Sequence, residues 1–334
     1  MASSSLRNRA LAVLLATAPA WAAADETIEV TALRQPVDKS YRKMVKGMEL
    51  FDERHAMAPD ATLRYKLLPR KRDTEMDGVA LQIVGERFKA PVAVAADHTF
   101  TLARLQKALD EDAVVRSERR AQSMTWRAEI RTPGLPPDTR RLGDLRLECQ
   151  VGMEAGLVSQ YPSVLGRLVD AVLGTAAFCT RSYAPYLFFA ERPLFSVTLS
   201  AGARREVLSV GQMYAAMAHG RTTKADLAHC DCEALLDRAY ILPLGDRRWP
   251  DDTRVELEYM DAAGADEAAL IGSTKADVAA AFGEARVVRF ESGFEVWAYQ
   301  SDRPEPPLGR SEFVVLFSPS GVVSKTRLRP APPP

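Results

Sequence analysis

The sequence has no excess of either charge. Its 334 residues include 44 lysines and arginines and 44 aspartates and glutamates, so the formal net charge is zero. A broad electrostatic attraction to nucleic acid or to an anionic membrane surface is therefore not expected. With 47% hydrophobic residues, the chain can still bury a large core.

The sequence also lacks the short motifs that mark common catalytic sites. It has no nucleophile elbow, zinc-protease helix, phosphate-cradling glycine loop or dinucleotide fingerprint. Ser40 and Lys43 have the Ser-x-x-Lys spacing of penicillin-recognising enzymes, but the companion motifs are missing, and we interpret Ser40 as a helix N-cap. Enzymatic activity is not indicated, and no cofactor is expected.

Residues 1–24 have the three parts of a secretory signal peptide. Arg7 and Arg9 precede an apolar run over Ala10–Ala20, and Ala22–Ala24 offers a small-residue cleavage site before Asp25. The apolar run is too short to span a bilayer permanently. The first cysteine is Cys149, so no lipid anchor near the start is expected. The mature protein is predicted to be periplasmic or secreted.

Residues 25–148 are expected to form an antiparallel β-rich domain. A helix is predicted over Asp38–Arg54. Strand-like runs separated by turn residues lie at Thr62–Leu67, Val79–Val84, Pro91–Ala95, Thr99–Leu102 and Met124–Ile130. Short strands at this spacing predict a sandwich. The basic pair Arg140-Arg141 is typical of a solvated loop.

Residues 149–259 are expected to form a mixed α/β region, either separate from residues 25–148 or sharing their core. We predict helices at Ser163–Phe178 and Lys224–Arg238, and strands at Phe195–Leu199, Ala239–Leu242 and Arg254–Tyr259. The helix at Ser163–Phe178 is short and interrupted by charge, which indicates a core helix rather than a membrane helix.

All four cysteines lie in this middle region, at positions 149, 179, 230 and 232. An even number in an exported protein predicts disulfides. We favour a Cys149–Cys179 bridge with a labile Cys230–Cys232 pair, only slightly over the two crossed pairings.

His219 and His229 lie close in sequence to Cys230 and Cys232. Thiolate and imidazole are ligands for zinc or copper, and a strained disulfide is readily reduced. A metal site or a redox dithiol is therefore an alternative to plain disulfides and surface histidines. The one-residue spacing of the two cysteines matches neither the usual zinc motif nor the thioredoxin motif, so plain disulfides are favoured.

Residues 260–328 are predicted to form a small domain of one helix and three antiparallel strands, followed by a proline-rich tail at 329–334. Thr274 and Asp277 form a predicted capping box, and Gly283 ends the helix. Phe290, Phe294, Val296 and Ala298 have one parity, and Glu295, Trp297 and Tyr299 have the other, which predicts a single half-buried strand. A second strand follows at Phe313–Phe317, and a third restarts at Val322.

This segment resembles the outer-membrane assembly lipoprotein domain called BamE or SmpA/OmlA. The matching positions are Gly272, Thr274, Lys275, Val278, Gly283, Trp297, Tyr299, Val315 and Phe317. Two departures are Ala285, where the family has proline, and the missing lipidated cysteine. β-Lactamase-inhibitor proteins use the same fold, so the fold does not determine the function.

The resemblance implies a non-enzymatic scaffolding or binding protein of the cell envelope that docks a protein partner in the periplasm or at the outer membrane. Glu295, Trp297 and Tyr299 would form the contact surface; the alternative is that these side chains cover the domain's own helix. A second hypothesis is inhibitor-like binding of an enzyme by the small sheet. A third is thiol or metal chemistry at His229, Cys230 and Cys232.

Overall fold

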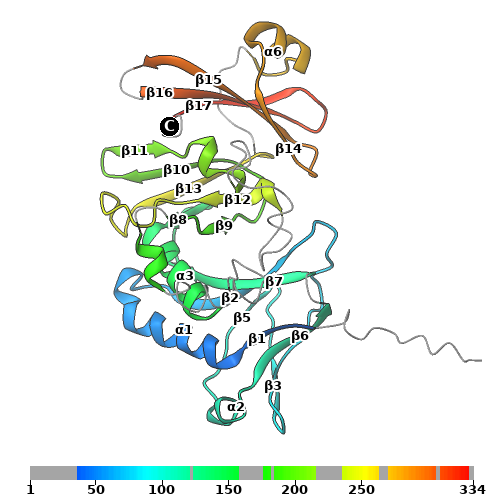
Figure 1. The fold of residues 1–334 in the computed structure, drawn as a ribbon, viewed down its shortest axis with the longest axis vertical. Helices are drawn as coiled ribbons and strands as arrows, with labels where there is room; N and C mark the ends of the chain where they lie inside the picture. Colours follow the sequence, from blue (N-terminus) through cyan, green and yellow to red (C-terminus); the bar gives the residue numbers. More distant parts are fainter. Residues whose placement is uncertain are drawn as a thin grey trace, which may run out of the picture.

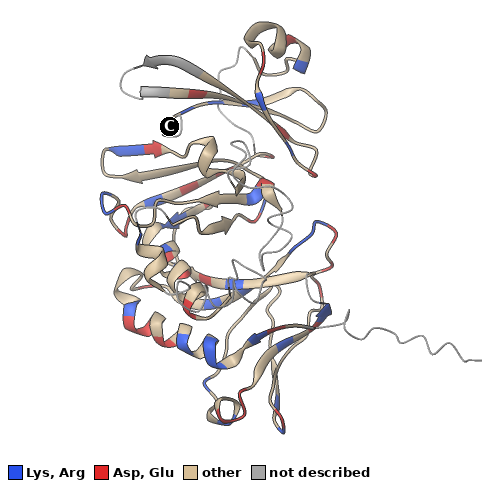
Figure 2. Cartoon of the chain, viewed as in Figure 1, with Lys and Arg blue, Asp and Glu red and all other residues tan. Residues whose placement is uncertain are grey.

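The computed structural model describes residues 36–120, 123–157, 176–181, 184–215, 235–262, 270–305 and 309–330. The chain has the predicted α+β class, and every strand pairing among these residues is antiparallel. Figure 1 shows layers stacked along the long axis, with the C-terminal sheet at one end and the N-terminal sheets at the other. Acidic and basic residues are interspersed through these layers (Figure 2). The predicted signal peptide lies outside the described residues.

Within the described ranges, no helix is both long enough and apolar enough to cross a membrane.

The N-terminal part contains two sheets that share one core with a helix. Its elements are β1 (Pro36–Ser40), α1 (Tyr41–Arg54), η2 (His55–Met57), β2 (Thr62–Pro69), β3 (Leu81–Val84), β4 (Lys89–Val92), β5 (Thr99–Phe100), α2 (Gln106–Asp110), β6 (Val114–Arg120) and β7 (Met124–Arg131). The sheets have the orders β1-β6-β3-β4 and β5-β2-β7. Trp126 is fully buried in their common core, together with Tyr41 and Met44 of α1. Ser40 caps α1 as predicted, because its hydroxyl accepts the Lys43 N–H.

The middle part adds a second core. It contains β8 (Thr139–Arg141), α3 (Leu142–Glu154), η3 (Ala176–Thr180), β9 (Leu187–Phe189), β10 (Leu194–Ala201), β11 (Arg204–Val207), η4 (Val210–Gln212), η6 (Leu236–Arg238), β12 (Ala239–Ile241) and β13 (Arg254–Tyr259). Its sheets have the orders β11-β10-β13-β8 and β12-β9. The strands predicted near residues 195, 239 and 254 are therefore present. Most of the two helices predicted at Ser163–Phe178 and Lys224–Arg238 lies outside the described residues.

Helix α3 belongs to both cores. Its Leu147 and Val151 pack into the N-terminal core, while Leu145 and Cys149 pack into the middle core. Gly47 lets α1 approach it closely, because a Cβ at this position would lie 2.8 Å from the Cβ of Ala155. The predicted division between residues 148 and 149 falls inside this helix, so the two regions share a structural element.

The favoured disulfide is present. Cys149 of α3 and Cys179 of η3 are joined with a Cα–Cα distance of 6.0 Å, and both are buried. The bridge closes a loop across 30 positions of sequence and ties η3 to α3. The other candidates, Cys230, Cys232, His219 and His229, lie outside the described residues.

The described residues of the C-terminal part form one helix and four strands, which corrects the predicted three-stranded sheet. Helix α6 (Lys275–Phe282) is followed by β14 (Arg286–Arg289), β15 (Glu295–Glu305), β16 (Gly309–Phe317) and β17 (Val323–Pro330), in the order β14-β15-β16-β17. We had expected Phe290 to share a strand with Phe294. Instead the Phe290 N–H donates to the Phe294 carbonyl across a tight turn that contains Gly293 at φ 85°. The turn creates the extra strand, β14.

Both faces of this sheet are covered. Val296 and Leu316 belong to the middle core, whereas Val315 and Phe317 pack with Val278 of α6. The predicted capping box is confirmed, since Thr274 and Asp277 bond each other's backbone N–H groups. Arg329, which we had assigned to a proline-rich tail, is instead fully buried in β17 and donates to the Phe195 carbonyl.

Candidate ligand-binding cleft

The three predicted contact residues of β15 lie beneath α6. The Glu295 carboxylate accepts from Lys275 Nζ at 2.5 Å and from Trp297 Nε1 at 2.7 Å. Burial alone would raise the pKa of Glu295, but these two bonds outweigh it and hold the pKa below its ordinary value. The Tyr299 ring lies 5.5 Å from the Phe282 ring of α6. These contacts hold the helix on its own sheet, and a role of the three residues in partner binding stays a prediction.

A cleft of about 580 Å³ lies elsewhere, between the sheet β5-β2-β7 and the strands β9 and β12. This volume falls within the range of small-molecule sites, roughly 300–1,000 Å³. One wall consists of side chains from β2 and β7, and the opposite wall of residues around β9 and β12.

The charged wall follows from the two-residue period of a strand. Along β7, Trp126 and Ala128 point into the N-terminal core, so Arg127 and Glu129 point to the opposite face. Strand β2 does the same and places Arg64 and Lys66 on the cleft face. The pairing register sets Arg64 opposite Glu129 and Lys66 opposite Arg127.

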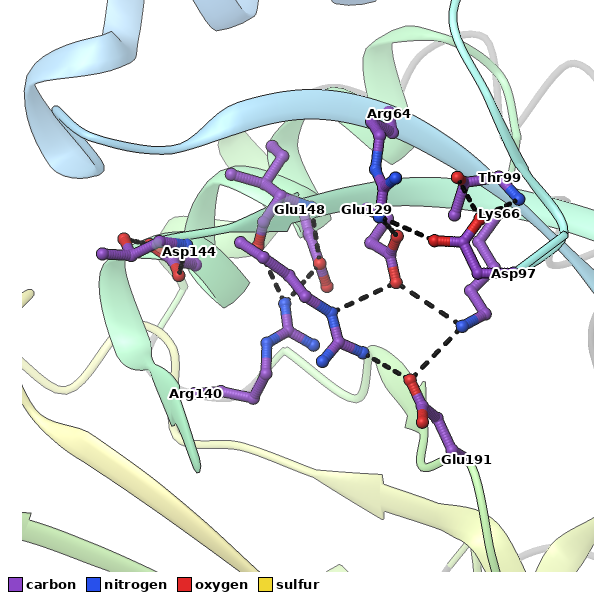
Figure 3. Close-up of polar contacts among 12 residues, drawn as sticks. Arg64, Lys66, Asp97, Thr99, Glu129, Arg140, Asp144, Glu148 and Glu191 are labelled. Carbon is purple, nitrogen blue, oxygen red and sulfur yellow. Dashed lines mark hydrogen bonds and ion pairs between the residues drawn. The ribbon is translucent and has the colours of Figure 1, made fainter. Parts of the chain in front are cut away.

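Most of these charges neutralise one another (Figure 3). Glu129 lies 3.4 Å from Arg64, 3.8 Å from Lys66 and 3.2 Å from Arg131. Glu191, which follows β9, lies 3.3 Å from Lys66 and 2.9 Å from Arg131. Burial would raise the pKa of Glu191, but these two cations lower it below its ordinary value. The network fixes the side chains of both strands and links them to the segment after β9.

A buried ion pair, Arg140 with Glu148, also lines the cleft. Arg140 of β8 donates to Glu148 of α3 at 2.5 Å and to the Ile130 carbonyl at 2.9 Å, and Glu148 also accepts the Ile130 N–H at 2.8 Å. Burial raises the pKa of Glu148, and Arg140 opposes that rise. The prediction that Arg140 lies in a solvated loop is therefore wrong. Its guanidinium is buried and hydrogen-bonds to the Ile130 carbonyl at the outer edge of β7.

The opposite wall is aromatic. The Phe188 ring lies 4.9 Å from that of Tyr186 and is stacked at 5.6 Å on that of Tyr240. The Arg127 guanidinium reaches this wall, with its carbon 4.7 Å from the Phe189 ring centre and 5.7 Å from that of Tyr186. Such distances are typical of cation–π contacts. The cleft thus combines an apolar aromatic surface with a charged sheet face.

The cleft carries an excess of positive charge although the whole chain is neutral. Of the residues that the structure describes, six lysine or arginine side chains and four carboxylates line it: Arg64, Lys66, Arg127, Arg131, Arg140 and Arg238, with Asp97, Glu129, Glu148 and Glu191. Across the part of the chain that the structure describes, no group of three or more His, Cys, Asp or Glu side chains is placed to hold a metal ion. The lining is therefore better suited to an anion.

Comparison of the chain with protein-family models, with curated proteins and with solved structures finds no match.

This cleft was not predicted from the sequence. The signal was the alternation of charged and apolar residues in Thr62–Leu67 and Met124–Ile130, both of which we predicted as strands. Such alternation is typical of a sheet with one solvated face. No local pattern indicates that β9 and β12 cover that face, because these strands lie far from β2 and β7 along the chain.

Proposed function

We propose that this protein is a non-enzymatic binding protein and that the cleft between β2-β7 and β9-β12 takes up a small ligand. The observation that carries the proposal is the cleft itself, in which a charged face held by its own ion pairs lies opposite a buried aromatic wall. Sites for small molecules commonly combine such an apolar lining with a few fixed polar groups.

The arrangement supports binding rather than catalysis. Glu129 and Glu191 each accept from two or more cations of the protein. Lys66 and Arg131 lower the pKa of Glu191, which makes it a poor proton donor, whereas a general acid or base needs a pKa near the working pH. The network instead holds the cleft in a fixed shape before a ligand arrives.

The predicted signal peptide and the Cys149–Cys179 disulfide support a location outside the cytoplasm, in the periplasm or cell envelope, because disulfides persist in oxidising compartments. In this proposal the protein binds its ligand there.

The test is native mass spectrometry of the protein purified gently from its own cell envelope. Leu68 lines the cleft and is half-buried, so Leu68→Trp should fill part of it. Val287 of β14 is exposed and does not line the cleft, so Val287→Trp is the matched control. We expect a small-molecule adduct on the wild type and on the control, and its loss in Leu68→Trp. An adduct that Leu68→Trp retains, or no adduct on any form, would overturn the proposal.

A second candidate is docking of a protein partner on the C-terminal sheet, as the BamE-like resemblance implies. One observation favours it: within the described ranges, the large apolar side chains that are exposed all belong to this part, namely Ile271, Phe282, Val287 and Leu328. The pairing register places Val287 beside Trp297 and Leu328 in line with Tyr299, so both flank the face that α6 covers.

Crosslinked recovery of envelope proteins with wild type and with Leu328→Lys tests this second candidate. We expect recovery of one protein with the wild type and its loss with the variant, at an unchanged thermal midpoint. Equal recovery with both forms would exclude Leu328 from the contact and argue against docking at this face.

A further inference from the structure

Arg127 differs from the other cations that β2 and β7 present to the cleft. Arg64, Lys66 and Arg131 each lie within ion-pair distance of a carboxylate. Arg127 has no such carboxylate among the described residues, although it is only 7% exposed. Its Nη1 donates to the Leu187 carbonyl at 2.8 Å, and its buried Nε has no hydrogen-bond partner. A buried charge without a counter-ion is destabilising, so its presence calls for an explanation.

The register makes this arrangement less favourable still. Lys66 and Arg127 are directly opposite each other on neighbouring strands. Like charges in such a pair destabilise a sheet. The Lys66 ammonium is held by Glu191 and Glu129, and the Arg127 guanidinium lies instead against Phe189 and Tyr186. Among the described residues, Arg127 is therefore a buried cation without a paired carboxylate at the junction of the charged wall and the aromatic wall.

Resting on the function proposed above, we propose that Arg127 receives the carboxylate of a small organic acid whose flat apolar part lies against the aromatic wall. A guanidinium is a planar fork that matches the two oxygens of a carboxylate. The rings of Tyr186, Phe188 and Tyr240 form an apolar surface beside that fork. The neighbouring cations are already held by Glu129 and Glu191, so the position favours one negative charge over the several of a phosphate.

The experiment is isothermal titration of the full chain without its signal peptide, with three probes. They are 3-phenylpropionate, the matched neutral 3-phenylpropanamide, and inorganic phosphate. We expect the acid to bind at least ten-fold more tightly than the amide or phosphate. Arg127→Met should lower the affinity for the acid at least ten-fold, and Arg127→Lys should retain part of it. Arg248→Met, at an exposed arginine outside the cleft, is the control and should bind as the wild type does.

A second measurement separates a binding role from a structural one. If Arg127 is kept for a ligand, Arg127→Met should unfold at the same temperature as the ligand-free wild type or at a higher one, because it removes an uncompensated charge. A lower midpoint would show that Arg127 supports the fold and would overturn the inference.

The outcomes distinguish this inference from the proposed function. If acid and amide bind equally and Leu68→Trp abolishes both, the cleft binds ligands but Arg127 does not select an anion. If phosphate binds more tightly than the acid, the assignment to an organic acid is wrong. If none of the three probes binds at millimolar concentration, the inference fails, whereas the proposed function is still decided by the adduct experiment.

Discussion

The buried pair of Arg140 and Glu148 allows a prediction in which the two partners respond differently. Glu148→Ala leaves the Arg140 charge buried without its carboxylate and removes the acceptor of the Ile130 N–H. Loss of one partner of a buried ion pair costs about 3–5 kcal/mol of unfolding free energy. Arg140→Met should cost less at low pH, because Glu148 can then bind a proton and become neutral.

The pH dependence of Arg140→Met has a definite sign. Burial already raises the pKa of Glu148 above its ordinary 4.5, and loss of the opposing guanidinium raises it further. Between 4.5 and the raised value, the folded variant binds more protons than the unfolded chain. Its stability therefore falls as the pH rises through this window. The cost of Arg140→Met should accordingly be smaller at pH 5 than at pH 8.

Urea unfolding followed by circular dichroism at the two pH values measures both effects. Glu148→Gln is the matched control, since it keeps an acceptor for Ile130 and cannot titrate. It should lose stability without the pH dependence of Arg140→Met. Two results would contradict this account of the Arg140–Glu148 pair at the edge of β7. One is an equal cost of Arg140→Met at pH 5 and pH 8, and the other is a cost of Glu148→Ala below about 1 kcal/mol.

Three further outcomes are expected. Replacing Cys149 and Cys179 by alanine should lower the unfolding free energy by about 3–4 kcal/mol, because the 30-position loop is no longer constrained in the unfolded chain. Urea unfolding of the wild type with and without reductant should show a loss of the same size. Thr274→Ala should cost about 1 kcal/mol through loss of the α6 cap, measured as the urea midpoint and contradicted by an unchanged one. Trp297→Ala and Tyr299→Ala should each lower the thermal midpoint by several degrees, because both side chains pack beneath α6. An unchanged midpoint together with loss of a bound protein would instead show that these residues contact a partner.

Features determined by neighbouring residues were predictable from the sequence. The capping box of Thr274 and Asp277, the Ser40 cap and strands such as Thr62–Pro69 each depend on a few adjacent side chains. The Cys149–Cys179 bridge was favoured only slightly over the two crossed pairings, because it leaves Cys230 and Cys232 to form a small strained ring.

Features that depend on distant contacts were missed. Strand β6 was not predicted, because Val114–Arg120 is rich in arginine and buries only Val115 and Ser117 strongly. The fate of a polar strand face depends on what covers it. At β7 the cover is protein, so Arg127 and Glu129 are buried where their pattern indicated solvent. Arg140 was misassigned for the same reason, since its partners are the β7 edge and α3.

The position of α3 also limits how the chain can be divided. A fragment that ends at residue 148 keeps Leu147 but lacks Val151 and Ala155, which complete the N-terminal core. A fragment that starts at residue 149 lacks Leu142 and Leu145, which belong to the middle core. Neither fragment can then fill its core. In the intact protein, both cores depend on α3, so their backbone amides should become exchangeable with solvent in the same opening event. A destabilising substitution inside α3 would therefore loosen the walls of the cleft and, at the same time, the middle core against which the C-terminal sheet packs.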